Sequence, residues 1–157
     1  MASDAGSTDR IEKRIILRAP CARVWRALSN AQEFGSWFGV DFGSASFAPR
    51  AKVRGRITVP GYEHLTMEIV IERMEPGRVL SYRWHPYAVD PQQDYSKEPM
   101  TLVEFKLREV PEGTLLTVTE SGFDRIPLHR RAEAFRMNDQ GWAGQVKNID
   151  AHVSRQA

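Results

Sequence analysis

The sequence predicts an α+β domain in which a curved antiparallel sheet wraps around a long C-terminal helix, with two short helices after the first strand. Alternating apolar and polar residues run from 52 to 120 and are broken by turn signals such as Pro60-Gly61, with no helical stretch between them. From residue 128 to 153 the apolar period changes to steps of three and four residues, as in an amphipathic helix. Each face must be buried, and the simplest solution packs the helix on the sheet.

The first elements follow from short local signals. Residues 11–17 are β-rich, with Ile11 and Leu17 on one face. Pro20 suits the first position of a helix. Asn30 and Glu33 have capping-box spacing, so a second short helix is expected to begin there.

The sheet and the last helix come next. The remaining strands are expected near 52–59, 65–72, 80–84, 103–108 and 116–120. Pro127 can open the helix, whose apolar stripe is Leu128, Phe135, Trp142, Val146, Ile149 and Val153. Gly141 and Gly144 each weaken this helix by about 1 kcal/mol, so we expect a kink or a close approach to another element there.

Composition narrows the class of protein. Its 157 residues predict one domain at 10–155 after a disordered tail at 1–9. The net charge of +2 argues against nucleic acid as a partner, and the basic cluster at 129–131 is expected to be a solvated helix face. A single cysteine, no signal peptide and no apolar run long enough to span a membrane predict a cytoplasmic protein.

A curved sheet around one helix leaves a space between them, and aromatic residues concentrate where that space should be. Small-molecule pockets are mostly apolar with a few placed polar groups. The predicted ligand-binding residues are Trp37, Phe38, Phe42, Met67, Tyr82, Trp84, Phe105, Glu120, Asn138 and Trp142. The alternative is that the aromatic side chains simply fill the core.

Two of these residues are polar interruptions of apolar faces. Glu120 is in phase with Leu116 and Val118 and should point inward, unless it reaches solvent at the strand end or pairs with an arginine. Asn138 interrupts the helix stripe. Glu120 and His85 are the best candidates for a catalytic acid or base, but His85 falls on the opposite parity from Trp84 and should face away, which leaves Glu120.

The loop from 85 to 100 separates two predicted strands. Asp90, Asp94 and Glu98 could gather a cation, but their spacing matches no calcium loop, and we expect a solvated loop and no metal site. With Tyr87 and Tyr95 the loop is a candidate lid over the cavity mouth. No phosphate-binding, dinucleotide or hydrolase motif is present, and no cofactor is expected.

Several motifs in this order resemble the START-like (SRPBCC) superfamily, whose members have the helix-grip fold. They are Val24-Trp25-Arg26-Ala27-Leu28, Trp37-Phe38-Gly39, Leu80-Ser81-Tyr82-Arg83-Trp84, the run 113–123, and Gly141-Trp142. Within it, residues 11–153 resemble the branch named for the activator of the 90-kDa heat-shock-protein ATPase, in its single-domain bacterial form. The superfamily resemblance implies binding of hydrophobic small molecules, sometimes with cyclase, dehydratase or hydrolase activity.

Three functions follow as hypotheses. The first is binding or carriage of a small hydrophobic ligand. The second is an enzyme of the cyclase, dehydratase or hydrolase type that uses Glu120. The third is regulation of a chaperone ATPase, which is disfavoured because the chain has no room for the extra N-terminal domain of the eukaryotic co-chaperone. The sequence does not indicate an oligomeric state.

Overall fold

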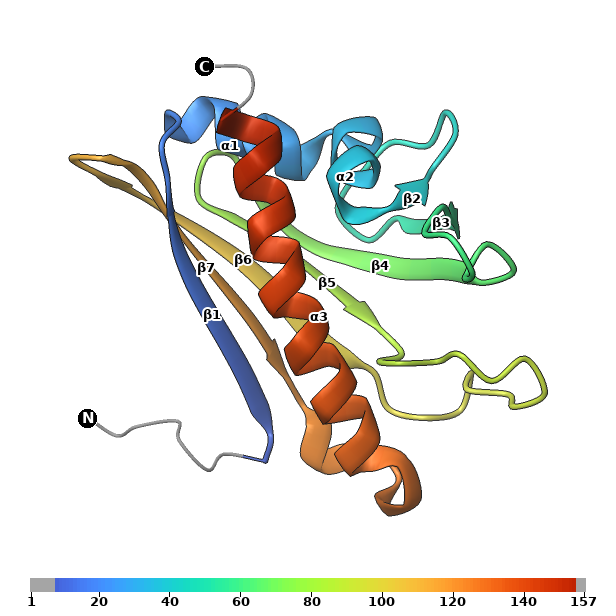
Figure 1. The fold of residues 1–157 in the computed structure, drawn as a ribbon. Helices are drawn as coiled ribbons and strands as arrows, with labels where there is room; N and C mark the ends of the chain where they lie inside the picture. Colours follow the sequence, from blue (N-terminus) through green and yellow to red (C-terminus); the bar gives the residue numbers. More distant parts are fainter. Residues whose placement is uncertain (1–7, 155–157) are drawn as a thin grey trace.

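A computed structural model describes residues 8–154 of the chain. Seven antiparallel strands form one sheet in the order β1-β7-β6-β5-β4-β3-β2. Figure 1 shows α3 lying across one face of this sheet, with α1 and α2 at one end. The elements are β1 (Arg10–Leu17), α1 (Cys21–Ser29), α2 (Ala31–Phe38), β2 (Val40–Asp41), β3 (Lys52–Ile57), β4 (Thr66–Glu75), β5 (Val79–Trp84), β6 (Thr101–Val110), β7 (Gly113–Ser121), the 3-10 turn η1 (Phe123–Arg125) and α3 (Leu128–Ser154).

This architecture is the predicted α+β arrangement, a helix on an antiparallel sheet with two short helices after β1. Most of the predicted tail at 1–9 lies outside the described residues. Of the two that are described, Thr8 donates from its hydroxyl to Asp124 at 2.7 Å, and the Asp9 carbonyl accepts from Gly122 N at 3.1 Å. These contacts join the start of the chain to the turn that follows β7.

The middle of the sheet carries the buried face that α3 covers. In β7, Leu116, Val118 and Glu120 are each at most 1% exposed, as expected from their shared parity. Glu120 stands opposite Ile11 in β1 and Val103 in β6, both of which are also buried. The carboxylate is therefore surrounded by apolar strand neighbours and must find its partners across the sheet face.

The strands β4 and β5 separate near one end of the sheet, as Figure 1 shows. Their pairing ends at Val70 and Arg83, so residues 66–69 of β4 have β3 on one side and no strand on the other. Pro86 follows β5 closely and has no N–H with which to continue the ladder. The result is a gap between β4 and the segment that leaves β5.

The stripe on α3 is only partly as predicted. Trp142, Ile149 and Val153 are buried, but Leu128 is 78% exposed, which contradicts its expected place in the core. Leu128 is the first residue of α3. The first aromatic contact of the helix comes about two turns later, where Phe135 packs on Phe123 with ring centroids 5.1 Å apart. Sequence periodicity marks a helix face, but it does not show where along the helix the sheet ends.

The glycines inside α3 also differ from expectation. A Cβ built at either Gly141 or Gly144 would meet nothing within 4 Å apart from the helix's own nearby backbone. The predicted close approach to another element is therefore wrong at both positions. The contrast is Gly35 in α2, where a Cβ would lie 2.1 Å from the carbonyl oxygen of Val40, so that α2 can pack directly against β2.

Candidate functional site

Glu120 is the centre of a buried hydrogen-bond network, which we call the Glu120 hub. Oε2 accepts from Trp84 Nε1 at 2.8 Å and from Thr101 Oγ1 at 2.6 Å. Oε1 accepts from Trp142 Nε1 at 2.8 Å. Asn138 Nδ2 donates to both oxygens, at 3.0 and 3.1 Å. Side chains from β5, β6 and α3 thus converge on one carboxylate of β7.

The chemistry of the hub is one-sided. An ionised carboxylate can only accept hydrogen bonds, and every partner of Glu120 is a donor. Neither an arginine nor solvent compensates the group, which is 0% exposed. Both sequence-based alternatives for Glu120, a solvent-facing strand end and an arginine pair, are therefore wrong. The inward orientation is confirmed, with neutral donors in place of a counter-charge.

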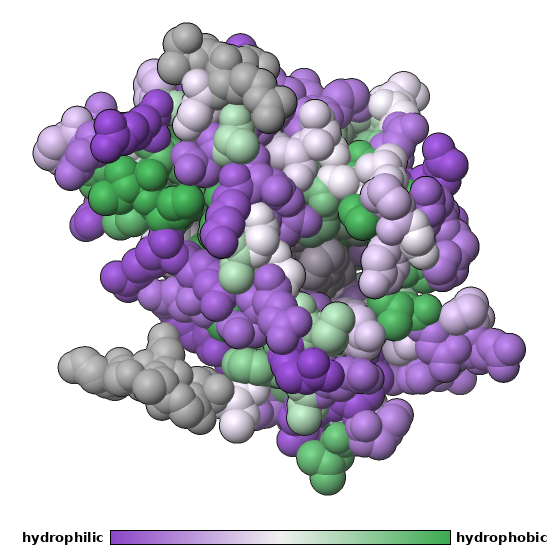
Figure 2. Space-filling view, in the orientation of Figure 1, coloured by the Kyte–Doolittle hydropathy of each residue, from purple (hydrophilic) through white to green (hydrophobic). Residues whose placement is uncertain are grey.

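A groove of about 300 Å³ lies beside the hub, in the gap between β4 and the segment after β5. We call it the α3–β4 groove. In Figure 2 the surface is hollowed on the side of α3 that faces β4. The lining is mostly apolar and consists of Phe38, Ile57, Leu65, Thr66, Met67, Glu68, Trp84, His85, Tyr87, Ala88, Val89 and Asn138.

A smaller side pocket of about 80 Å³ shares Phe38, Trp84 and Asn138 with the groove and adds Trp142 to the wall. Trp84, Asn138 and Trp142 are also three of the four donors to Glu120. Because hydrogen bonds to one buried acceptor restrict side-chain rotamers, the hub holds the polar ends of these wall residues in place. It leaves their remaining surfaces facing the cavities.

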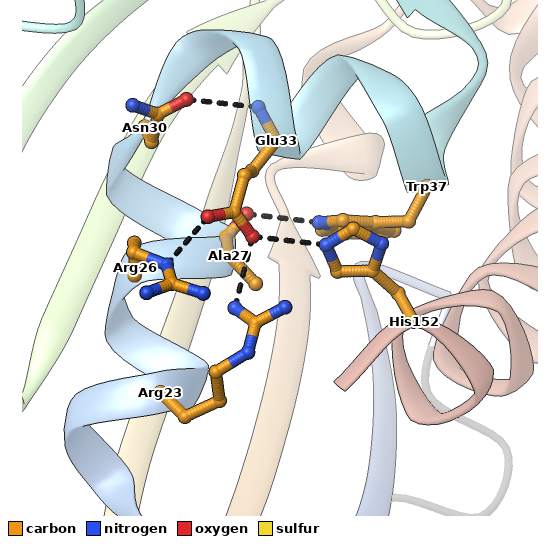
Figure 3. Close-up of polar contacts among 7 residues, drawn as sticks. All are labelled: Arg23, Arg26, Ala27, Asn30, Glu33, Trp37 and His152. Atoms are coloured by element: carbon orange, nitrogen blue, oxygen red, sulfur yellow. Dashed lines mark hydrogen bonds and ion pairs between the residues drawn. The ribbon is translucent and has the colours of Figure 1, made fainter. Parts of the chain in front are cut away.

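The position of α2 sets the position of Phe38 in the groove wall. Asn30 caps this helix as predicted, with Oδ1 accepting from Glu33 N at 2.9 Å. The Glu33 side chain does not return to the cap. It binds Arg23 at 2.9 Å, Arg26 at 2.6 Å and His152 at 2.9 Å, and so ties α1, α2 and α3 together (Figure 3).

Glu33 responds to two opposing influences. Its burial raises the pKa of the carboxyl, but the hydrogen bonds from His152, Arg23 and Arg26 outweigh burial and hold the pKa below its ordinary value of 4.5. Gln145 of α3 also donates to the Phe38 carbonyl at 2.8 Å. The start of α2 is therefore tied to α3 through Glu33 and His152, and its end, which carries Phe38, through Gln145.

Arg130 anchors the other wall of the groove. It is only 8% exposed and pairs with Glu98 at 2.7 Å, so the expectation of a solvated basic face at 129–131 is wrong for this residue. Its Nη1 donates to the Pro86 carbonyl at 2.8 Å, and its guanidinium lies 4.7 Å from the ring centroid of Tyr95. Nη1 also donates to the Tyr87 carbonyl at 3.4 Å, so one side chain of α3 contacts four residues of the loop at 85–100.

The predicted site residues fall into two groups. Phe38, Met67, Trp84 and Asn138 line the α3–β4 groove, and Trp142 lines the side pocket. The others do not line the groove: Trp37, Phe42, Tyr82 and Phe105 are buried in the packed core, and Glu120 is the hub.

The core group has its own partners. Trp37 donates its indole N–H to the Ala27 carbonyl at 2.9 Å, and Phe42 packs on Phe47 with centroids 5.4 Å apart. The ring of Phe105 lies 5.7 Å from that of Trp142. Burial, and then the charge of Glu120, raise the pKa of the Tyr82 hydroxyl well above its ordinary value of 10.0. These four side chains belong to the packed core and not to the groove wall.

Sequence reasoning missed several wall residues. His85 lines the groove although strand parity turns it away from Trp84, because β5 ends at Trp84 and the groove extends into the gap beyond it. Burial lowers the pKa of His85, although the Glu98 charge opposes this. Pro86 was the available signal, since a proline just after a strand predicts that pairing stops there.

None of the helices within residues 8–154 is long and apolar enough to cross a membrane. The same residues contain no group of three or more histidine, cysteine or acidic side chains placed to hold a metal ion. Glu98, one of the acidic loop residues considered for a cation, is paired with Arg130.

A seven-stranded antiparallel sheet covered by a long C-terminal helix, with two short helices after β1, defines the helix-grip class of START-like domains. Residues 18–154 match the family model described as "Activator of Hsp90 ATPase homolog 1-like protein", and the chain belongs to this family. None of the curated proteins matches the chain.

Solved structures similar to this chain support the fold. Protein MLL2253 from Mesorhizobium loti is 21% identical, with a TM-score of 0.72 over 94% of this chain and 98% of that one. NE0264 from Nitrosomonas europaea is 14% identical, with a TM-score of 0.73 over the whole of both chains. DynU16, described as a putative protein in the dynemicin biosynthetic locus, is 23% identical over 93% of this chain and 47% of its own, with a TM-score of 0.69. At these identities the likeness concerns the fold.

Proposed function

We propose that the protein binds or carries a small hydrophobic molecule in the α3–β4 groove. The observation that carries this proposal is a cavity of about 300 Å³ with a mostly apolar wall and few polar groups, the character of small-molecule sites. The family often binds hydrophobic ligands, which agrees with this wall. Aromatic faces of Phe38, Trp84 and Tyr87 suit a flat, ring-containing ligand.

The arrangement of the hub favours binding over acid/base catalysis by Glu120. A general base must reach the proton that it removes, within hydrogen-bond distance of the substrate. Both oxygens of Glu120 are occupied by donors from the protein, and the residue is not part of the groove wall. Its role in this proposal is to hold Trp84 and Asn138 in place.

The test combines ligand capture with a blocked variant. Native mass spectrometry of the protein purified from its own host should show a retained small molecule. A compound library should contain ligands that raise the melting temperature by several degrees, because a ligand at 100 times its Kd stabilises by about 2.7 kcal/mol. An empty protein that responds to no compound contradicts the proposal.

The variant Ala88→Trp places the shift in the groove. Ala88 is a half-buried residue of the groove wall outside the Glu120 hub, so an indole there should fill the cavity without disturbing the hub. The shift should fall by at least half. Ala22→Trp, at an exposed position on α1, is the matched control and should keep the full shift. An unchanged shift in Ala88→Trp would mean that the ligand binds elsewhere.

A further inference from the structure

We infer that the α3–β4 groove selects ligands that donate a hydrogen bond, such as hydroxyl or ammonium compounds, over isosteres without a donor and over carboxylates. This inference rests on the proposed function and names the chemistry of the ligand that the same groove takes. It follows from the orientation of one side chain, Asn138, which belongs both to the hub and to the groove wall.

Glu120 determines which way the Asn138 amide points. Both oxygens of the carboxylate accept from Nδ2, at 3.0 and 3.1 Å. The reversed amide would place Oδ1 against the Glu120 carboxylate, which has only acceptors. The two oxygens would repel each other, and the carboxylate would lose one of its donors. A fully buried charge therefore fixes an amide whose orientation would otherwise be free.

The consequence for the groove is an acceptor on its wall. With Nδ2 committed to Glu120, Oδ1 is the remaining polar atom of Asn138, and it accepts no hydrogen bond from any residue between 8 and 154. Among these residues, Oδ1 is not one of the fully buried side-chain atoms that lack a hydrogen-bond partner, so it is open to solvent. Asn138 lines both the groove and the side pocket. Where a ligand covers its free oxygen, only a donor on the ligand compensates for the lost water.

The charges around the groove exclude an anionic head group. Its wall contains Glu68 but no lysine or arginine. Burial lowers the pKa of His85 and so disfavours a positive charge on this wall residue. Arg130, which lies behind the loop, is committed to Glu98 and to the Pro86 carbonyl. A carboxylate placed in the groove would find no positive charge, whereas an ammonium group would find acceptors and aromatic faces.

The experiment compares four naphthalene compounds of similar size by isothermal titration calorimetry at neutral pH. They are 2-naphthol, 2-naphthylmethylammonium, 2-methoxynaphthalene and 2-naphthoate. One hydrogen bond to a groove acceptor should make 2-naphthol bind about five- to tenfold more tightly than 2-methoxynaphthalene. The ammonium compound should bind at least as tightly as 2-naphthol, and 2-naphthoate should bind most weakly.

Two variants trace the preference to Asn138. Asn138→Leu removes Oδ1 and should lower the ratio of naphthol to methoxynaphthalene affinity to about one, while methoxynaphthalene still binds. Gln140→Leu, at an exposed position on the same helix, is the control and should keep the wild-type ratio. Glu120→Gln supplies an amide that can donate to Asn138, so the Asn138 amide can turn and the ratio should fall here too. If this variant does not fold, the wild-type and Asn138→Leu ratios still decide.

The outcomes separate this inference from the proposed function. A ratio that persists in Asn138→Leu, or wild-type protein that binds 2-naphthoate as tightly as 2-naphthol, overturns the inference while the groove remains a binding site. Failure of all four compounds to bind the wild-type protein counts against the proposed function, and the inference fails with it.

Discussion

Replacing Glu120 with alanine removes the acceptor on which four side chains depend. The indole N–H groups of Trp84 and Trp142, the Thr101 hydroxyl and the Asn138 amide all lose their partner. A buried donor left without a partner costs about 1–3 kcal/mol. Thr101 can rotate its hydroxyl, and Asn138 and Trp84 border the groove, so the buried indole of Trp142 bears the largest share of the cost. We expect Glu120→Ala to lower the free energy of unfolding by about 3–5 kcal/mol.

Equilibrium unfolding in urea, followed by tryptophan fluorescence, measures this cost. Glu120→Gln keeps the volume and one acceptor oxygen, so it should cost about 2 kcal/mol. Glu109→Gln, at an exposed position of β6, should change the free energy of unfolding by less than about 0.5 kcal/mol. If Glu120→Ala costs no more than the Glu109 control, or if glutamine and alanine at 120 cost the same, the hub does not act as an acceptor for these donors and the reasoning is refuted.

Four further substitutions test the surroundings of the groove. Gly144→Ala should stabilise the protein by about 1 kcal/mol in urea unfolding, because a Cβ there meets nothing within 4 Å, whereas Gly35→Ala should destabilise it by about 3 kcal/mol or more, because its Cβ would lie 2.1 Å from a carbonyl oxygen. Arg130→Ala should cost about 3 kcal/mol and speed amide hydrogen exchange in the loop at 85–100, since it leaves Glu98 unpaired. Glu33→Gln should destabilise the protein at neutral pH, and the loss of stability should shrink as the pH falls below 4.5, the ordinary pKa of the carboxyl. A carboxyl whose pKa is lowered by folding stabilises the protein above its ordinary pKa and loses this contribution as the pH falls through its folded-state pKa.

Each of these predictions would be contradicted by a particular result. Equal effects of alanine at Gly35 and Gly144 would mean that α2 does not pack as closely as described. Arg136→Ala, at an exposed position on α3, is the control for Arg130→Ala. Equal exchange rates of the loop in the two variants would mean that Arg130 does not hold the loop at 85–100 in place. A difference between wild type and Glu33→Gln that stays constant down to about pH 3 would show that the carboxylate does not gain from its cationic partners.

The sequence was sufficient for features that depend on local periodicity. Parity along β7 predicted the inward side chain of Glu120, and the spacing from Asn30 predicted the cap of α2. It was insufficient where a side chain depends on a distant partner. Arg130 was predicted to be part of a solvated cluster because Glu98, the acidic residue that pairs with it, lies 32 residues away in the chain. Likewise, aromatic content alone could not separate Trp84 in the groove wall from Tyr82 in the core.

The Glu120 hub is difficult to explain by stability alone. A buried charge with its partners is often no more stabilising than well-packed apolar residues of the same volume, even though removing one member of the set is costly. An apolar residue at 120, with apolar partners in place of the donors, would fill the space under the groove equally well. It would not, however, define which atom Asn138 presents to a ligand, and it would not hold the indole of Trp84 in one rotamer. The charge therefore acts on the polarity and geometry of the groove wall. If the groove binds a ligand as proposed, substitutions at the hub should change ligand selectivity as well as stability.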